Sequence, residues 1–148
     1  MNYNEFKKII KNYEINSTYL LIGEEEYLID ECLDLFKKTY IDNNFETLNY
    51  AILDGKMATI DDLINTCETL PFMSSKKLVI LKDVHLFLDK GDSLNELYTY
   101  LDDLGNHVCL LMVDNNNELK KTTKLYKYYK KNNTVVEFAK LKGKDLSK

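Results

Sequence analysis

The chain has 148 residues, only one proline and five glycines, and 45% of its residues are hydrophobic. These values are typical of one globular domain with its own core, and they exclude global disorder, collagen-like sequence and a disulfide-rich scaffold. No run of 18 apolar residues occurs, and the first ten residues lack a signal-peptide pattern. We therefore expect a soluble, cytoplasmic protein without membrane contact.

The net charge of −4 is unevenly divided along the chain. Residues 1–117 carry a net charge of −11, whereas residues 118–148 hold ten lysines against three acidic residues, or +7. Such a split indicates an acidic partner, nucleic acid included, or a lysine-rich helical surface. The 20 basic residues are all lysines, so an arginine finger is excluded.

Alternating apolar runs and helical patterns define the fold class. The β-prone runs are residues 18–22, 48–53, 78–81, 108–113 and 134–138, and the helical patterns are residues 3–12, 25–41, 59–70, 93–104 and 117–131. Thr59 is expected to cap the third helix, and Ser93 with Glu96 to form a capping box on the fourth. Nearly continuous apolar strands separated by helices predict an α/β fold, a five-stranded parallel sheet flanked by helices on both sides.

The loop after the first strand is where a nucleotide would be sought in such a sheet. It reads Gly23, Glu24, Glu25, Glu26, with one glycine, no lysine and no hydroxyl residue. Three carboxylates favour the positive end of the following helix and repel a triphosphate. Nucleotide binding is therefore not expected, and no cofactor is assigned.

Other candidate catalytic and metal-binding residues are scattered. Asp54, Asp83 and Asp114 follow apolar strands and could hold magnesium, but caps and turns are the favoured interpretation. The three cysteines (Cys32, Cys67 and Cys109) include no C-x-x-C pair, and His85 and His107 form no metal-ligand motif. We expect no catalytic site, no metal site and inert, buried thiols.

Two surface features remain. On the helix predicted over residues 117–131, four lysines align opposite the apolar face and could contact phosphate or an acidic protein: Lys120, Lys124, Lys127 and Lys131. The alternative interpretation is that these lysines form a solvated helix face without a partner. Between residues 70 and 77, Pro71 ends a helix and Phe72 and Met73 follow side by side in a loop, flanked by Lys76 and Lys77. Adjacent apolar residues in a loop are either tucked into the core or displayed for a partner.

The residues of this loop, together with the strands around it, resemble a known family. The segments that carry the resemblance are YLLIGEEEYL at residues 19–28, LPFMSSKKLVIL at 70–81, LLMV at 110–113 and VVEF at 135–138. They are similar, in order and spacing, to the N-terminal domain of the delta subunit of bacterial DNA polymerase III, part of the sliding-clamp loader. The match covers essentially the whole chain, and residues 70–81 are its most specific part.

The resemblance implies a degenerate AAA+ domain over residues 1–140 that lacks a nucleotide site, followed at 141–148 by the start of a truncated helical lid domain. It implies a non-catalytic accessory subunit of a DNA-directed DNA polymerase, a nucleotidyltransferase. The implied partners are the β sliding clamp, the delta prime and tau/gamma loader subunits through a missing C-terminal domain, and DNA indirectly. The implied clamp-binding residues, which help to open the ring, are Leu70, Pro71, Phe72, Met73, Ser74, Ser75 and Lys76.

Two alternatives stay open. One is a magnesium-dependent phosphotransfer or nucleotidyl enzyme that uses Asp54, Asp83 or Asp114, and it requires two carboxylates to converge on one metal. The other is a receiver-like signalling domain, which requires an acidic pair, an aspartate that accepts phosphate and a lysine around one pocket.

Overall fold

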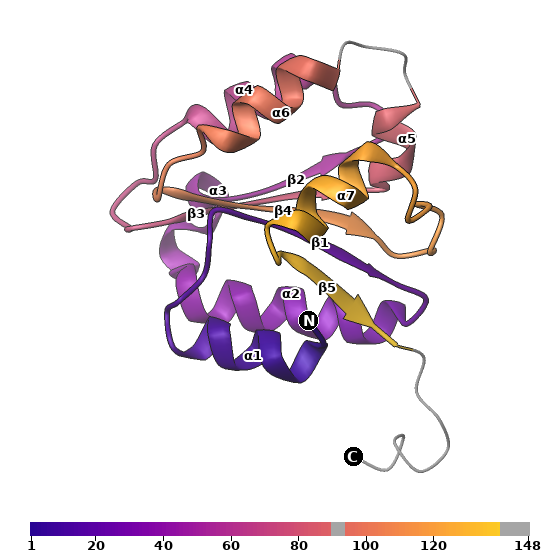
Figure 1. The fold of residues 1–148 in the computed structure, drawn as a ribbon. Coiled ribbons are helices and arrows are strands. Elements are labelled where there is room, and N and C mark those ends of the chain that lie inside the picture. The colour runs from indigo at the N-terminus through magenta and orange to yellow at the C-terminus, as the bar shows by residue number, and fades with distance from the viewer. Residues whose placement is uncertain (90–93, 140–148) are drawn as a thin grey trace.

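The computed structural model describes residues 1–89 and 94–139, and its centre is a five-stranded sheet (Figure 1). The strands are β1 (Thr18–Gly23), β2 (Tyr50–Asp54), β3 (Lys77–Lys82), β4 (Val108–Asp114) and β5 (Val135–Phe138). Their order across the sheet is β2-β3-β4-β1-β5, and every pairing is parallel. The expected α/β class and parallel sheet are confirmed.

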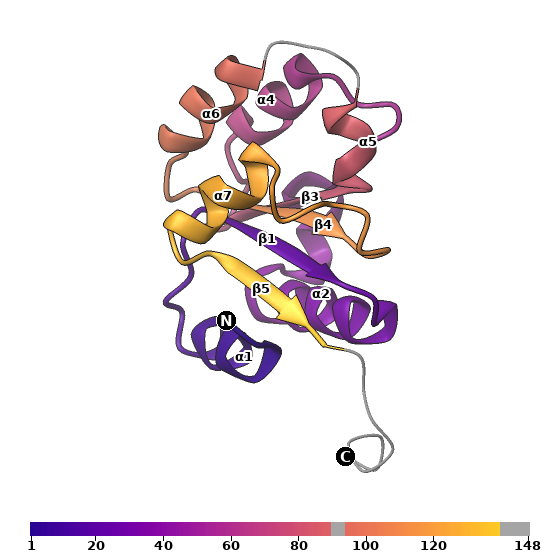
Figure 2. The same ribbon diagram turned by 45° about the vertical axis from the view of Figure 1, so that its right-hand side comes forward.

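Helices cover both faces of the sheet, as the nearly continuous apolar strands require. Helices α1 (Tyr3–Lys11) and α2 (Glu26–Tyr40) lie on one face, and α4 (Ile60–Glu68), α5 (Val84–Leu88), α6 (Leu94–Asp102) and α7 (Lys124–Lys131) lie on the other (Figure 2). A 3-10 turn, η1 (Asn43–Phe45), and a four-residue helix, α3 (Glu46–Asn49), precede β2. No helix in the described ranges is long and apolar enough to cross a bilayer.

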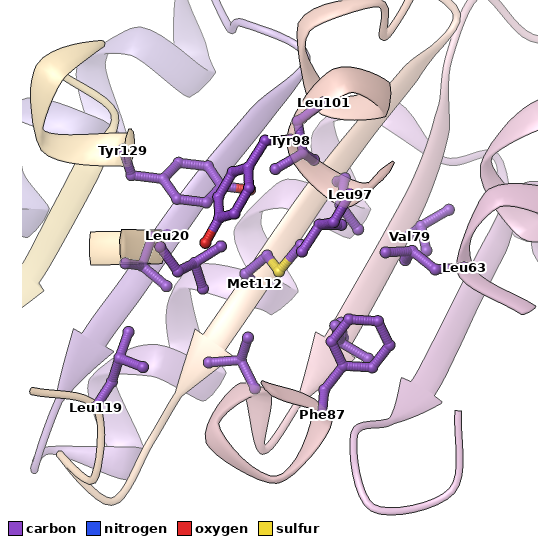
Figure 3. Packing of buried hydrophobic residues seen from close by; sticks show 14 of the residues in the cluster. Leu20, Leu63, Val79, Phe87, Leu97, Tyr98, Leu101, Met112, Leu119 and Tyr129 are labelled. Atoms are coloured by element: carbon purple, nitrogen blue, oxygen red, sulfur yellow. The ribbon is translucent and has the colours of Figure 1, made fainter. Parts of the chain in front are cut away.

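Each face of the sheet builds its own core. On the side of α1 and α2, Phe6, Ile29 and Phe36 pack against inward residues of the strands. On the other side, Leu63, Leu97 and Tyr129 pack against Leu20, Val79 and Met112 (Figure 3). The central strand β4 is buried along its whole length, whereas the edge strand β2 is largely accessible.

The helix boundaries follow local capping. Thr59 caps α4 as expected: its hydroxyl accepts from the Asp62 N–H, and the Asp62 carboxylate accepts from the Thr59 N–H. Asn2 makes the same reciprocal pair with Glu5 at the start of α1. Ser93 lies outside the described residues, and so does the segment 141–148 that is expected to begin a lid domain.

Four expected elements are wrong by two residues or more at one end. The helices expected over 59–70 and 93–104 end at Glu68 and Asp102, so α4 ends before it reaches Pro71. Residues 48 and 49 belong to α3, so β2 begins at Tyr50 and not at residue 48. The helix expected over 117–131 begins at Lys124, with Thr123 as its N-cap. Asn117 adopts a positive φ of 54°, and the buried Asp114 side chain organises residues 118 and 119 into a turn instead.

Candidate functional site

The most prominent apolar surface is the loop between α4 and β3, which we call the 70–76 loop. Helix α4 ends at Glu68, and the residues that follow it lie where β3 begins, at the left of Figure 1. The loop therefore lies where the strands of the sheet begin. The β1–α2 turn lies at the opposite ends of the strands, because it follows the carboxyl end of β1 in the same parallel sheet. The side chains of Leu70, Phe72 and Met73 are 71%, 50% and 74% exposed. The apolar side chains of the loop could be buried in the core or exposed for a partner, and these values favour exposure.

The backbone of the loop is fixed although its side chains are exposed. Asn49, a fully buried residue at the end of α3, accepts a hydrogen bond from the Phe72 N–H at 2.6 Å and donates one to the Phe72 carbonyl at 2.7 Å. The Phe72 ring also meets the Phe45 ring edge-on, with centroids 5.3 Å apart. Two backbone bonds and one ring contact therefore hold Phe72 in place.

The start of the loop is held through the last carbonyl groups of α4. Lys77 Nζ donates to the Thr66 carbonyl at 2.7 Å, and His107 Nε2 lies 3.0 Å from the Cys67 carbonyl. Because a carbonyl oxygen only accepts, Nε2 of His107 carries the proton in this contact. Both donors also complement the negative end of the helix dipole. The helix end is thus tied to β3 and to the residue that precedes β4.

Lysines that flank an apolar pair could steer it towards an acidic partner surface, but hydrogen bonds and burial engage Lys76 and Lys77 within the domain. Lys77 is buried, and its removal from water lowers the pKa of its ammonium group, so it is not free to steer a partner. The Lys76 ammonium donates to the Asn106 carbonyl at 2.6 Å. The Ser74 hydroxyl donates to the Lys76 carbonyl. Lys76 and Lys77 therefore fasten the end of the loop to its own domain.

Met73 has an unusual backbone, with φ at +53°. A left-handed conformation costs a residue with a Cβ about 1–2 kcal/mol. Such strain persists where the surrounding structure determines it, and it is concentrated at functional sites. Here it accompanies a long apolar side chain that is three-quarters exposed.

The β1–α2 turn offers no cradle for phosphate. The Glu26 N–H donates to the Glu24 carbonyl at 3.2 Å, so it does not point into an open loop. A Cβ built on Gly23 would overlap the Phe138 carbonyl oxygen, which means that β5 lies directly against the turn. A shallow hollow of about 230 Å³ beside it is lined by Lys121 but also by Glu24 and Glu137.

Two of the three strand-end aspartates, Asp114 and Asp54, bind backbone N–H groups. Both carboxylate oxygens of the buried Asp114 accept backbone N–H groups, from Glu118 at 3.0 Å and Leu119 at 2.9 Å. Asp54 accepts from the Lys56 N–H, and Asp83 precedes α5 with a φ of +53°. Within residues 1–89 and 94–139, no three His, Cys, Asp or Glu side chains are grouped to hold a metal ion. The preferred interpretation as caps and turns fits Asp54 and Asp114, whereas Asp83 occupies the N-cap position of α5 without a capping bond from its side chain.

The thiols are buried, as expected. Cys32 and Cys109 lie in the core beside α2, and Cys67 lies in the opposite core. Burial raises the pKa of Cys67 to about 12 and raises those of Cys32 and Cys109 as well. Thiols held in this neutral form are poor nucleophiles.

The expected lysine stripe does not lie on one helix. Lys120 precedes α7, so only Lys124, Lys127 and Lys131 share it. Lys124 is also engaged, because its Nζ lies 4.7 Å from the centre of the Tyr98 ring and 3.3 Å from Asn95 Oδ1. The lysines remain exposed, but they form a looser patch than an aligned row.

Two residues of the site, Asn49 and His107, are not predicted by the sequence patterns. Asn49 lies inside the run 48–53, which is typical of a strand, and nothing in that pattern indicates a hydrogen-bonding role for its side chain. His107 is a candidate from sequence only for metal binding or catalysis. One feature of the sequence could have drawn attention to Asn49: it is a polar residue within an apolar run. A buried asparagine must find hydrogen-bond partners for its amide.

Comparison with known proteins agrees with the resemblance seen in the sequence. Residues 19–139 match the family model described as DNA polymerase III, delta subunit. The chain is 25% identical over 144 residues to the DNA polymerase III subunit delta of Bacillus subtilis, and the match covers 93% of this chain and 42% of that protein.

Solved structures give the same result. The Bacillus subtilis DNA clamp loader delta protein superposes with a TM-score of 0.84 at 26% identity, covering 95% of this chain and 43% of that one. A DNA polymerase III gamma-subunit-related protein from Thermotoga maritima shares the fold, with a TM-score of 0.64 at 17% identity over 97% of this chain and 47% of that one. The sheet is thus of the AAA+-like type, and the chain spans less than half the length of these relatives. With the family model matching most of its residues, the chain belongs to the DNA polymerase III delta subunit family.

Proposed function

We propose that this domain binds the β sliding clamp through the 70–76 loop and helps to open the ring for loading onto primed DNA. Phe72 and Met73 are the anchors that enter an apolar pocket of the clamp, and the other residues of the surface are Leu70, Pro71, Ser74, Ser75 and Lys76. The domain acts as a non-catalytic accessory subunit without ATPase activity of its own.

One observation supports the proposal: the loop is apolar at its surface while hydrogen bonds hold its backbone at Phe72. Leu70, Phe72 and Met73 are exposed, while Phe72 is bonded to Asn49 by both of its backbone groups. A loop that is ordered before binding loses less conformational entropy on docking, so more of its apolar contact appears as affinity. Apolar anchors of this kind account for most of the energy of many interfaces.

The test is the double variant Phe72→Ala/Met73→Ala. Its affinity for the β clamp of the same organism, measured by surface plasmon resonance, should fall at least thirtyfold, which corresponds to about 2 kcal/mol or more. A thermal melt should show that the fold survives. Normal clamp binding by this variant would refute the anchor assignment, and a melting temperature many degrees lower would assign the pair to the core.

The chain offers a matched control for the anchors. Met57 is 73% exposed, nearly the same as Met73 at 74%, but it follows β2 at the opposite edge of the sheet. Ile52 on β2 is 51% exposed and matches Phe72 at 50%. The double variant Ile52→Ala/Met57→Ala should therefore bind the clamp normally, since it removes similar apolar surface elsewhere.

Ring opening needs a measurement separate from binding. Clamps preloaded on nicked circular DNA should be released when the wild-type domain is added, and not when the Phe72→Ala/Met73→Ala variant is added. Contacts with the delta prime and tau/gamma subunits are proposed to use mainly the regions that the longer relatives have beyond the matched part. DNA is then reached indirectly, as part of the loader.

An enzyme or a receiver-like domain is less well supported. The enzyme needs two carboxylates that converge on one metal, and the receiver-like domain needs an acidic pair, an aspartate that accepts phosphate and a lysine around one pocket. Asp114 and Asp54 are instead bonded to nearby backbone N–H groups. Soaking with magnesium and a phosphate analogue would reveal density at the strand ends if either alternative held.

A further inference from the structure

We propose that the docking surface has a second half, the short helix α3, in which Leu48 contacts the clamp beside Phe72 and Met73. This inference rests on the function proposed above, and it adds a residue from the segment that precedes β2. It starts from the contacts that join α3 to the 70–76 loop.

Two different contacts make α3 and the loop one unit. The Asn49 amide binds both backbone groups of Phe72, and the Phe45 ring meets the Phe72 ring edge-on at 5.3 Å. Phe45 is the N-cap of α3 and Asn49 is its last residue. Both ends of this one-turn helix therefore touch the same residue of the loop, and α3 lies beside the loop in Figure 1.

Leu48 is the apolar residue of α3. Residues three and four apart in a helix are neighbours on its surface, so Phe45 has Leu48 and Asn49 as neighbours. Phe45 and Asn49 contact Phe72, and Leu48 precedes Asn49 in the turn between these two contact residues. Its side chain is 53% exposed, which leaves an apolar group open to solvent in the helix that contacts the loop.

One charged residue of α3 is paired within the domain. The Glu46 carboxylate pairs with Lys37 at 3.1 Å, and the Lys37 ammonium also lies 4.8 Å from the centre of the Tyr50 ring. The hydrogen bond to Glu46 raises the pKa of Lys37, so this lysine stays charged. An apolar partner surface that covers Leu48 therefore leaves the Glu46 carboxylate with its counter-charge.

Interface size points the same way. A stable protein interface usually buries about 800 Å² on each partner, from roughly 20–30 residues a side. The 70–76 loop is too small to supply that area alone. The segment that Asn49 and Phe45 join to the loop is α3, and Leu48 is its one apolar residue. The clamp surface that surrounds the pocket for Phe72 is therefore expected to be apolar where it meets Leu48.

The experiment compares Leu48→Ala, Leu48→Asp and the matched control Ile52→Ala in the 148-residue chain, with clamp binding and a thermal melt for each. We expect Leu48→Ala to weaken binding about threefold to tenfold, Leu48→Asp to weaken it more than about tenfold, and Ile52→Ala to have no effect. Alanine is a good helix former, so Leu48→Ala keeps the test valid if the aspartate variant melts early.

The outcomes separate the two proposals. If Leu48→Ala binds normally while Phe72→Ala/Met73→Ala does not, α3 is not part of the interface and the proposed function stands. If the double variant also binds normally, the proposed function fails and this inference fails with it. An equal loss with Ile52→Ala would mean a general surface effect and would also overturn the assignment of Leu48.

Discussion

Asn49 holds Phe72 by both of its backbone polar groups, although 23 residues separate them in the chain. The amide of Asn49 imitates a neighbouring strand: its oxygen accepts the Phe72 N–H at 2.6 Å and its nitrogen donates to the Phe72 carbonyl at 2.7 Å. The contact joins the segment before β2 to the segment before β3 at the edge of the sheet.

Replacing Asn49 with alanine should destabilise the domain and weaken clamp binding together. Removing the amide leaves two partly buried backbone groups of Phe72 without this partner, and the cost is at most the value of about 1–3 kcal/mol for a fully buried unsatisfied group. The loop must then be ordered when it binds, which lowers affinity. Urea unfolding and surface plasmon resonance measure the two effects.

Two further variants make this prediction specific. Asn49→Asp keeps an acceptor for the Phe72 N–H but places a carboxylate oxygen against the Phe72 carbonyl, so it should not rescue either property. Asn4→Ala removes an exposed asparagine from α1 and should change stability by less than about 0.5 kcal/mol. Wild-type clamp binding by Asn49→Ala would contradict the proposed ordering role.

Replacing Met73 with glycine should destabilise the domain less than replacing it with alanine. At φ +53°, glycine avoids the left-handed penalty of about 1–2 kcal/mol, although its greater freedom in the unfolded state offsets part of the gain. We expect Met73→Gly to be more stable than Met73→Ala in urea unfolding, and both to lose clamp affinity because the anchor is gone.

Met57 supplies the reverse comparison. It is as exposed as Met73 but is not among the residues with positive φ. Met57→Gly should therefore be less stable than Met57→Ala, and both should bind the clamp normally. If the alanine variant is more stable than the glycine variant at position 73 as well as at position 57, the backbone at Met73 is not strained.

The lysine patch should not give this domain much affinity for DNA. We expect duplex binding weaker than the low-micromolar range at physiological salt, because residues 1–117 carry a net charge of −11. If DNA does bind, replacing Lys120, Lys127 and Lys131 with glutamine should reduce the salt dependence by a slope of about 0.9 for each phosphate group that is no longer bound. Fluorescence anisotropy at several salt concentrations measures both the affinity and the slope.

ATP should not bind to this domain. The turn after β1 has no lysine or hydroxyl residue to meet a triphosphate and magnesium, and Phe138 lies against Gly23. Calorimetry with ATP and magnesium should give no heat of binding. Magnesium-dependent binding with a millimolar or lower Kd would contradict this expectation.

The sequence predicts the layered fold well because its signal is periodic and local. Five apolar runs and their intervening helical patterns indicate the parallel sheet, and Thr59 with Asp62 marks the start of α4. The order β2-β3-β4-β1-β5 is set by contacts between distant segments. No local pattern encodes it.

The errors at residues 48–49 and 117–123 have a physical cause. Leu48 and Asn49 are compatible with a strand by composition, but Asn49 is fixed by Phe72, a partner 23 residues away. The helical pattern from residue 117 is overruled by the Asp114 carboxylate, which holds the N–H groups of Glu118 and Leu119. For the candidate site, Phe72 and Met73 could be selected from the sequence, whereas their exposure and the bonds beneath them could not.

Stability should fall steeply above about pH 9. Burial raises the pKa of Cys67 to about 12 and also raises the pKa values of Tyr19, Tyr129 and Cys109 above those of exposed groups. A group whose pKa is raised in the folded state favours folding fully below its unfolded pKa, and this contribution is lost as the pH rises towards the folded value. The lowered pKa of Lys77 acts in the opposite direction, but it is one group against several.

Urea unfolding under reducing conditions, at a series of pH values from about 8 to about 11, tests this expectation. Each such group can contribute up to about 1.4 kcal/mol per pH unit to the decline between its two pKa values. The variant Cys67→Ala should be less stable at the lowest pH of the series, because it loses a buried side chain. Its stability should nevertheless fall less than that of the wild type as the pH rises, since one titrating thiol is absent. Parallel curves for the two proteins would show that the thiol of Cys67 does not govern the alkaline decline.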